Sequence, residues 1–267
     1  MFKAGFIGTG SMGSMLVRKF VESKALLPRD IIVFNRTPEK MNLLAENTGV
    51  KTAFCSRDVA ENSEMVFLCV LPGEVKKVLE DIKSVMNSEK TVVSIASDVS
   101  MEKIKNWSGF DAVRVIPSIT SECGCGVTVL TFPKNVPTKT REDIITLFGH
   151  IGKTFRADES LVPLLSDLTS SSPAIIASLI REYASAVSRS GKISVSDAQC
   201  LLTEAFFGTA KLISEKAETP ESLVSAVSTE GGITYEGVKV VKEKSPRLFD
   251  EILQSMDLKH KYLGQKL

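Results

Sequence analysis

The chain has 267 residues, of which 43% are hydrophobic and 24% charged, a balance typical of a globular protein of one or two domains with an ample core. The formal net charge is +1 and no long basic run occurs, so nothing predicts a nucleic-acid-binding surface. No apolar stretch reaches the roughly 18 residues of a membrane span, and the amino terminus does not read as a signal peptide. The five cysteines lack the spacing of a disulfide framework, which favours free thiols and a cytoplasmic location.

A GxGxxG pattern follows the first expected strand. The apolar run 2–7 predicts that strand, and the apolar spacing over 12–21 predicts a helix. The first glycine permits a tight turn, the second lets backbone approach phosphates, and the third lets the helix pack on the strand. N–H groups at the helix start would bind a pyrophosphate, although a plain glycine-rich turn is the simpler alternative. The residues of this predicted dinucleotide-binding loop are Gly8, Thr9, Gly10, Ser11, Met12 and Gly13.

The end of the second expected strand, 31–34, indicates which dinucleotide is bound. An NAD-selective fold usually has an acid about 20 residues beyond the glycines, where it binds the ribose hydroxyls. Here that place is taken by Asn35, and Arg36 follows. A guanidinium group suits a phosphate dianion, so we expect NADPH, with NADH possible. Thr37 belongs to the same predicted loop, although it also fits as the N-cap of a helix.

Strand and helix patterns alternate up to about residue 158. This alternation predicts a doubly wound, Rossmann-like parallel sheet, in which ligands bind beyond the carboxyl ends of the strands. The segments that follow the strands are therefore candidate binding segments. Further strands are expected at 65–70, 91–95, 112–116, 127–131 and 154–156, helices at 75–82, 101–105 and 138–148, and binding segments at 8–13, 35–40, 70–74, 95–98 and 116–121.

Strand patterns stop after residue 158. Apolar residues at helical spacing predict a helix over 173–187 and a longer one over 198–213, the latter preceded by a capping pattern at Ser194 and Asp197. We therefore expect a dinucleotide-binding domain over 1–158 and an all-helical substrate and dimerisation domain over 159–267. Helices this apolar need more cover than a small bundle supplies, so we expect a homodimer or a higher homo-oligomer.

Six short segments, in this order and spacing, resemble those of one known family. It is pyrroline-5-carboxylate reductase, the enzyme that completes proline biosynthesis, and the resemblance covers nearly the whole chain. It implies NADPH-dependent hydride transfer to a cyclic imine, which reduces 1-pyrroline-5-carboxylate to L-proline. The segments are GFIGTGSMG (5–13), LCVLP (68–72), VSIA (93–96), VRVIP (113–117), LTSSSPA (168–174) and VSTEGGIT (227–234).

The resemblance also implies roles for individual residues. The hydroxyl of Thr234 would hydrogen-bond to the ring nitrogen of the substrate. Backbone N–H groups of the glycine turn before it would hold the substrate carboxylate without an arginine. The hydroxyl run 169–172 would lie near the substrate, and it also reads as the N-cap of a helix that starts at Pro173. The remaining implied residues are Gly231, Gly232, Ile233 and Ser171 for the substrate, and Val70, Leu71, Pro72 and Ala96 for the cofactor.

Departures from the family pattern keep other functions open. They are Ser118, Ser170, Ser172, Glu230 and Ile233. A non-catalytic or regulatory NADP-binding homologue, a reductase of another imine, and an enzyme acting on a β-hydroxyacid-type substrate are the alternatives.

Histidine and metal chemistry are not expected. His150 sits near a helix end, where the helix dipole explains a histidine, and His260 lies in a charged tail, so neither has the setting of a general base. The pair Cys123 and Cys125 lacks the further ligands that a metal site requires.

Overall fold

The computed structural model of the chain describes residues 1–216 and 218–266. Two compact units make up the chain, the first formed by Met1–Pro173 with His260–Leu267 and the second by Ala174–Lys259. The first unit extends past the boundary expected at residue 158, because the helix that follows packs against the sheet. Among the described helices, none combines the length and apolar character that crossing a membrane requires.

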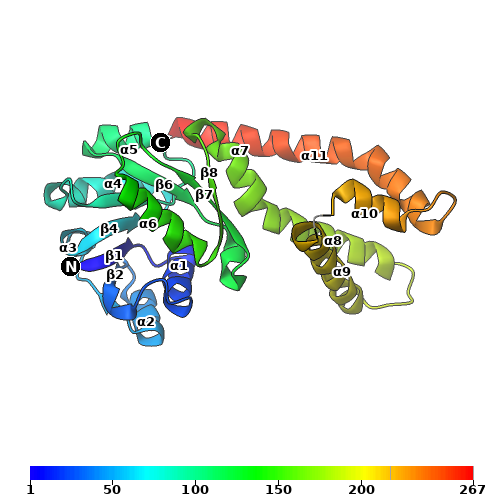
Figure 1. Cartoon of the computed structure of the whole chain (residues 1–267), viewed down its shortest axis with the longest axis horizontal. Helices are drawn as coiled ribbons and strands as arrows, with labels where there is room; N and C mark the ends of the chain where they lie inside the picture. The colour runs from blue at the N-terminus through cyan, green and yellow to red at the C-terminus, as the bar shows by residue number, and fades with distance from the viewer. Residues whose placement is uncertain (217, 267) are drawn as a thin grey trace. The chain divides into compact units, whose positions relative to one another are not determined.

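An eight-stranded sheet forms the centre of the first unit (Figure 1). Its strand order is β3-β2-β1-β4-β5-β6-β7-β8, and the chain order reverses between β1 and β4, the switch point of a doubly wound sheet. The expected Rossmann-like fold is therefore confirmed. The strands are β1 (Phe2–Ile7), β2 (Ile31–Phe34), β3 (Lys51–Thr52), β4 (Ser63–Leu68), β5 (Thr91–Ser94), β6 (Ala112–Ile116), β7 (Gly126–Thr131) and β8 (Gly152–Arg156).

Two details of the sheet differ from the expected parallel sheet. The pair β6 and β7 is antiparallel, whereas the other neighbouring pairs are parallel. Residues 117–125, which include the 3-10 helix η3 (Ile119–Cys123), join these two strands, and a parallel pair would need a crossover of a dozen or more residues. The edge strand β3 was not expected, because its two residues are exposed and carry no apolar pattern.

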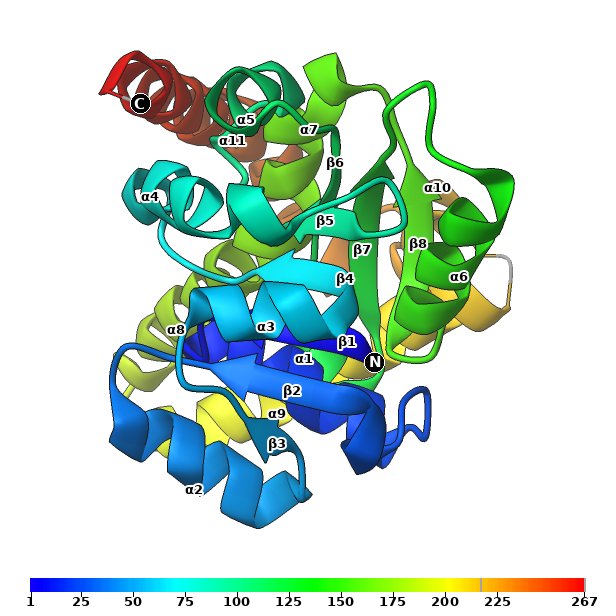
Figure 2. The same ribbon diagram turned by 90° about the vertical axis from the view of Figure 1, so that its left-hand side faces the viewer.

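Helices cover both faces of the sheet (Figures 1 and 2). One buried cluster joins the sheet to α1, α2 and α6, and the other joins it to α3, α4 and α5. Four phenylalanines centre the first cluster, where the stacked rings of Phe6 and Phe67 lie 4.6 Å apart. The helices are α1 (Ser11–Glu22), α2 (Pro38–Thr48), α3 (Ser56–Asn62), α4 (Pro72–Ile82), α5 (Met101–Ser108), α6 (Thr138–Gly149) and α7 (Val162–Ser166).

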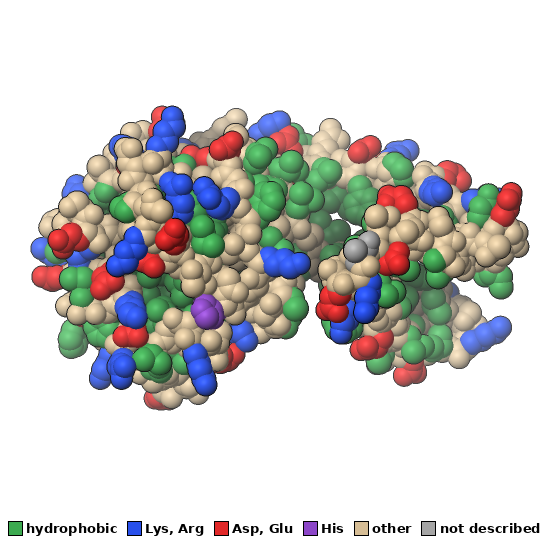
Figure 3. All heavy atoms as spheres, in the orientation of Figure 1, with side chains coloured by type: hydrophobic (Ala, Val, Ile, Leu, Met, Phe, Trp, Pro, Cys, Tyr) green, Lys and Arg blue, Asp and Glu red, His purple; other side chains and the backbone are tan. Residues whose placement is uncertain are grey.

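The described residues of the second unit form helices joined by loops, with no strand among them. Ser194 caps the second of its helices by accepting a hydrogen bond from the backbone of Asp197 at 3.0 Å, as expected. Large apolar side chains reach the surface of this unit, where hydrophobic side chains are visible in Figure 3. The helices are α8 (Ser172–Ser188), α9 (Val195–Glu215), α10 (Pro220–Val227) and α11 (Ile233–Lys266), of which α8 begins and α11 ends within the first unit.

Candidate dinucleotide and substrate site

A cleft of about 1040 Å³ opens at the switch point of the sheet in the first unit. The segments that follow β1, β2, β4, β5 and β6 all contribute to its lining. The predicted cofactor residues Thr9 and Gly13 belong to the glycine loop but are not among the residues that line the cleft. The predicted cofactor residues that line it are Gly8, Gly10, Ser11, Met12, Asn35, Arg36, Thr37, Val70, Leu71, Pro72 and Ala96.

Each of the three glycines of the loop is required, or tolerated, for a different structural reason. Gly8 has φ +105°, and a Cβ there would lie 2.3 Å from the Cys69 carbonyl oxygen. A Cβ on Gly13 would lie 2.2 Å from the carbonyl oxygen of Gly8, so this glycine lets α1 approach β1. A Cβ on Gly10 would meet nothing within 4 Å, and this residue is the N-cap of α1. The backbone is therefore bare where a helix N-terminus faces the cleft, which fits a bound pyrophosphate.

Asn35 connects the glycine loop to the loop after β2. Its Oδ1 accepts a hydrogen bond from the backbone N–H of Thr9 at 3.0 Å, and its Nδ2 donates to the carbonyl of Thr37 at 3.0 Å. The amide thus stands at the position where NAD-selective folds usually carry an acid, and it holds the loop after β1 to the loop after β2.

Arg36 lies on the β2 side of the cleft in an exposed ion pair. Its Nη1 lies 2.8 Å from Oε1 of Glu74, and 87% of its side chain is exposed. Exposed pairs of this kind contribute at most about 1 kcal/mol, so a phosphate can displace the carboxylate from the guanidinium. Lysines and an arginine from neighbouring elements also line this side. They are Lys40, Arg57 and Lys77.

The segment 55–57 is one part of the cleft that the sequence did not indicate. It follows β3, the strand that has no apolar pattern, and it contributes Cys55, Ser56 and Arg57. Arg57 lies in the first turn of α3, five residues after β3, and no strand pattern precedes it that could have marked the segment. The segments 95–98 and 116–121 were expected, and the cleft lining includes Ser97 and Pro117 from them.

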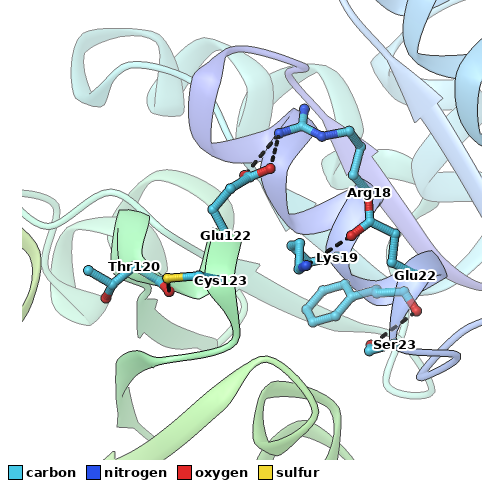
Figure 4. Close-up of polar contacts among 8 residues, drawn as sticks. Arg18, Lys19, Glu22, Ser23, Thr120, Glu122 and Cys123 are labelled. Atoms are coloured by element: carbon cyan, nitrogen blue, oxygen red, sulfur yellow. Dashed lines mark hydrogen bonds and ion pairs between the residues drawn. The ribbon is translucent and has the colours of Figure 1, made fainter. Parts of the chain in front are cut away.

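The loop after β6 is attached to α1 by an ion pair (Figure 4). Arg18 of α1 donates from one nitrogen to both carboxylate oxygens of Glu122, at 3.0 and 2.9 Å. Within the loop, the hydroxyl oxygens of Ser118 and Thr120 lie 2.9 Å apart. Ser118, one of the departures from the family pattern, is therefore buried in a local hydroxyl pair.

The hydroxyl run 169–172 does not cap a helix, which corrects the expectation of a helix starting at Pro173. Residues 162–188 are helical without a break, with one π-turn, Asp167–Ser171, between α7 and α8. The hydroxyl of Ser170 donates to the carbonyl of Pro117 at 2.8 Å. Thr169 and Ser172 bond back to carbonyls one turn earlier, as Ser and Thr do inside helices. Ser171 lies at the end of this π-turn.

The loop 229–234 of the second unit ends at the start of α11. Gly231 has φ +78°, and the N–H of Gly232 donates to the carbonyl of Thr229 at 2.9 Å, which closes a turn. Ile233 and Thr234 form the first turn of α11 and are exposed. Backbone N–H groups of a first turn have no acceptor within the helix, so they can receive an anion. The N–H of Gly232 already donates to the carbonyl of Thr229, so in this conformation it is not free to bind the substrate carboxylate.

His260 lies in the charged tail as expected, but its ring is partly buried and has partners that the sequence did not indicate. Its ring lies between two carboxylates of the first unit, with Nδ1 3.1 Å from Oδ1 of Asp98 and Nε2 2.9 Å from Oδ1 of Asp167. Burial lowers the pKa of His260, but the hydrogen bonds and charges of both carboxylates outweigh burial and raise that pKa above its ordinary value. His150 caps the carboxyl end of α6, as expected.

The thiol of Cys69 lies next to the glycine loop. Burial raises the pKa of this thiol, so it stays protonated. Within the described residues, no three histidine, cysteine or acidic side chains come together as a metal site would require.

The fold and the cleft define the class of protein: an NAD(P)H-dependent oxidoreductase with a doubly wound dinucleotide-binding unit. Residues 3–98 match the family model described as NADP oxidoreductase, coenzyme F420-dependent, and residues 159–261 match the one described as pyrroline-5-carboxylate reductase dimerisation. The chain belongs to the pyrroline-5-carboxylate reductase family. Its dimerisation domain makes it a homo-oligomer.

Relatives match along nearly the whole chain. The pyrroline-5-carboxylate reductase of Escherichia coli is 30% identical over 92% of this chain and 91% of its own length. ComE operon protein 4 of Bacillus subtilis is 29% identical over 97% of this chain and 95% of its own length. A solved pyrroline-5-carboxylate reductase from Coxiella burnetii has a TM-score of 0.90 at 26% identity, covering 98% of both chains.

Proposed function

We propose that this protein reduces 1-pyrroline-5-carboxylate to L-proline with NADPH. Membership of the family, along nearly the whole chain, supports the reaction, and the open backbone at Gly10 is the structural observation that carries it. Bound NADPH would supply a hydride to C5 of the imine ring. One proton completes the reduction, so that one imine, one NADPH and one proton give one proline and one NADP⁺.

We assign the cofactor to the cleft of the first unit. The pyrophosphate would lie on the N–H groups at the start of α1, beside the bare backbone of Gly10. The 2′-phosphate would lie at Arg36 and take the place of the Glu74 carboxylate. The nicotinamide would then extend toward Ala96 and Ser97, which follow β5. In the strand order, β5 lies across the switch point from β2 and β3.

We assign the substrate carboxylate to the first turn of α11. The N–H groups of Ile233 and Thr234 belong to the start of a long helix, whose dipole favours an anion. The Thr234 hydroxyl would donate a hydrogen bond to the ring nitrogen of the neutral imine, or accept one from the N–H of the protonated imine. Gly231 serves the turn through its positive φ, and Gly232 serves it through its bond to Thr229. Ser171 would lie near the substrate.

We also propose a homodimer and a cytoplasmic location. The family model for dimerisation covers residues 159–261. The cysteines, all in the described part of the chain, are free, as thiols are in a reducing compartment.

The experiment is a cofactor-oxidation assay with purified protein, NADPH and a panel of cyclic imines that includes pyrroline-5-carboxylate. We expect turnover of pyrroline-5-carboxylate, with L-proline as the product identified by chromatography. Tight NADPH binding without turnover of any imine would instead support a regulatory homologue. Turnover of another ring size with none of pyrroline-5-carboxylate would reassign the substrate.

A further inference from the structure

We propose that His260 is a positioning residue, which bridges Asp98 and Asp167 and so holds together two segments, 95–98 and 166–171, that shape one end of the cofactor cleft. The proposal rests on the proposed reduction, because it assigns that end to the nicotinamide. His260 contacts neither cofactor nor substrate in this assignment and acts through the two carboxylates.

The first observation is the geometry of the bridge. Each ring nitrogen of His260 lies within 3.1 Å of a different carboxylate oxygen. An ionised carboxylate can only accept hydrogen bonds, so both ring nitrogens must donate, and a ring that donates twice is an imidazolium cation. A neutral ring would turn a lone pair toward one of the carboxylates. The three side chains have exposed fractions of 22%, 13% and 8%, so solvent screens this bridge less than a surface pair.

The second observation is where the two carboxylates are attached. Asp98 follows Ser97, which lines the cleft and whose carbonyl accepts a hydrogen bond from buried Arg114. Asp167 begins the π-turn and lies between Ser166 and Ser170, both of which line the cleft. π-Turns are rare, strained insertions that recur at functional sites. His260 thus joins a strand-end loop to a π-turn at one end of the cleft.

The third observation is the length of the connection along the chain. His260 is 162 residues from Asp98 and 93 residues from Asp167. The last turns of α11 are attached to the first unit a second time, because the ammonium of Lys103 donates to the carbonyl of Gly264 at 2.8 Å. The charged residues nearest to His260 along its own helix are Asp257, Lys259 and Lys261, and Arg114, which donates to the Ser97 carbonyl, pairs with Glu159.

The direction of the pH dependence follows from the charge. The hydrogen bonds and charges of the two aspartates raise the pKa of His260 in the folded state, against the effect of burial. A bridge of this kind is complete below the ordinary pKa of histidine, about 6.5, and is lost as the pH rises through the raised value. The positioning effect should decline over the same interval.

The first test uses the fact that the chain has two histidines. Proton NMR of the wild type resolves two imidazole signals, and His150→Gln removes one of them, which assigns the other to His260. We expect the His260 signal to titrate above pH 6.5, the ordinary value for histidine. Titration of His260 at or below its ordinary pKa would overturn the bridge, and this readout needs neither substrate nor cofactor.

The second test measures kcat, KM and the NADPH dissociation constant from pH 6 to 9 for the wild type and His260→Gln, with His150→Gln as the matched control. Small misplacements at a reacting centre cost up to about a hundredfold, so we expect kcat of His260→Gln to fall about tenfold at pH 6.5, with NADPH affinity within about threefold. The deficit should shrink as the pH rises. A constant deficit at all pH values, or none, would contradict the proposal.

A third arm covers a variant that fails to fold. If His260→Gln is not folded, Asp98→Asn leaves the histidine in place and removes one charge of the bridge, so the His260 signal should titrate lower and kcat should fall. An unmoved signal and unmoved kcat would refute the proposal. A wild type that binds NADPH but reduces no imine would refute the proposed function, whereas the NMR titration would still decide whether the bridge exists.

Discussion

At the scale of single residues, we propose that Arg36 selects NADPH over NADH. The structure pairs it with Glu74 in an exposed contact that a 2′-phosphate can replace. We expect Arg36→Met to weaken NADPH binding by about 1–3 kcal/mol, the range for charge-assisted hydrogen bonds, and to leave NADH binding nearly unchanged. Fluorescence titration with both cofactors measures this, and Arg29→Met, outside the cleft lining, is the control. An equal loss for both cofactors would contradict the assignment.

The hydroxyl of Thr234 is the group that we propose to hydrogen-bond to the ring nitrogen of the substrate. Thr234→Val keeps the shape of the side chain and removes the donor, so we expect kcat to fall about 10- to 100-fold, with little change in NADPH affinity. Thr203→Val, an exposed threonine in α9, is the matched control. Steady-state kinetics with pyrroline-5-carboxylate measures both variants. Unchanged kcat in Thr234→Val would show that the reaction does not depend on a hydrogen bond from this hydroxyl to the ring nitrogen.

At the scale of elements, substitutions at two glycines of the same loop should have different effects, one on the stability of the fold and the other on cofactor binding. A Cβ on Gly13 would overlap the backbone of Gly8, so we expect Gly13→Ala to lower the free energy of unfolding by about 1–3 kcal/mol, as overpacking does. Gly10 has φ −70° and open space around it, so Gly10→Ala should unfold at the wild-type temperature. The same methyl group would occupy the pyrophosphate position and weaken NADPH binding at least tenfold, about 1.4 kcal/mol. Thermal unfolding and cofactor titration measure both variants, and wild-type NADPH affinity in Gly10→Ala would disprove the pyrophosphate assignment.

Elements with a strong local pattern were predictable, and elements without one were not. The glycine loop between β1 and α1 has both a spacing and apolar flanks, so its position was predictable. β3 is two exposed residues and was missed, and with it the cleft segment 55–57. The run 169–172 was misread as a cap because Ser and Thr serve equally as caps and as residues that bond back inside a helix.

At the scale of the whole molecule, the helical unit exposes apolar side chains that a second copy would cover. Leu201, Phe207 and Val241 are 64%, 63% and 60% exposed in the single chain. We expect Phe207→Glu to shift the protein toward the monomer, because burying a charge in an apolar interface is costly. Phe54→Glu is the control, since Phe54 is 97% exposed in the first unit. Analytical ultracentrifugation measures the oligomer, and a dimer that survives Phe207→Glu would place the interface elsewhere.

The sequence alone determined most strands and helices in their order, the glycine loop, the basic residue after β2 and the family, because each depends on residues close together in the chain. Only the tertiary structure decided that Asn35 joins two loops, that Glu74 occupies Arg36, and that His260 lies between Asp98 and Asp167. Apart from the bond from Asn35 to Thr37, these contacts join residues from 26 to 162 positions apart. Such pairings depend on how strands and helices pack, and no local spacing records them.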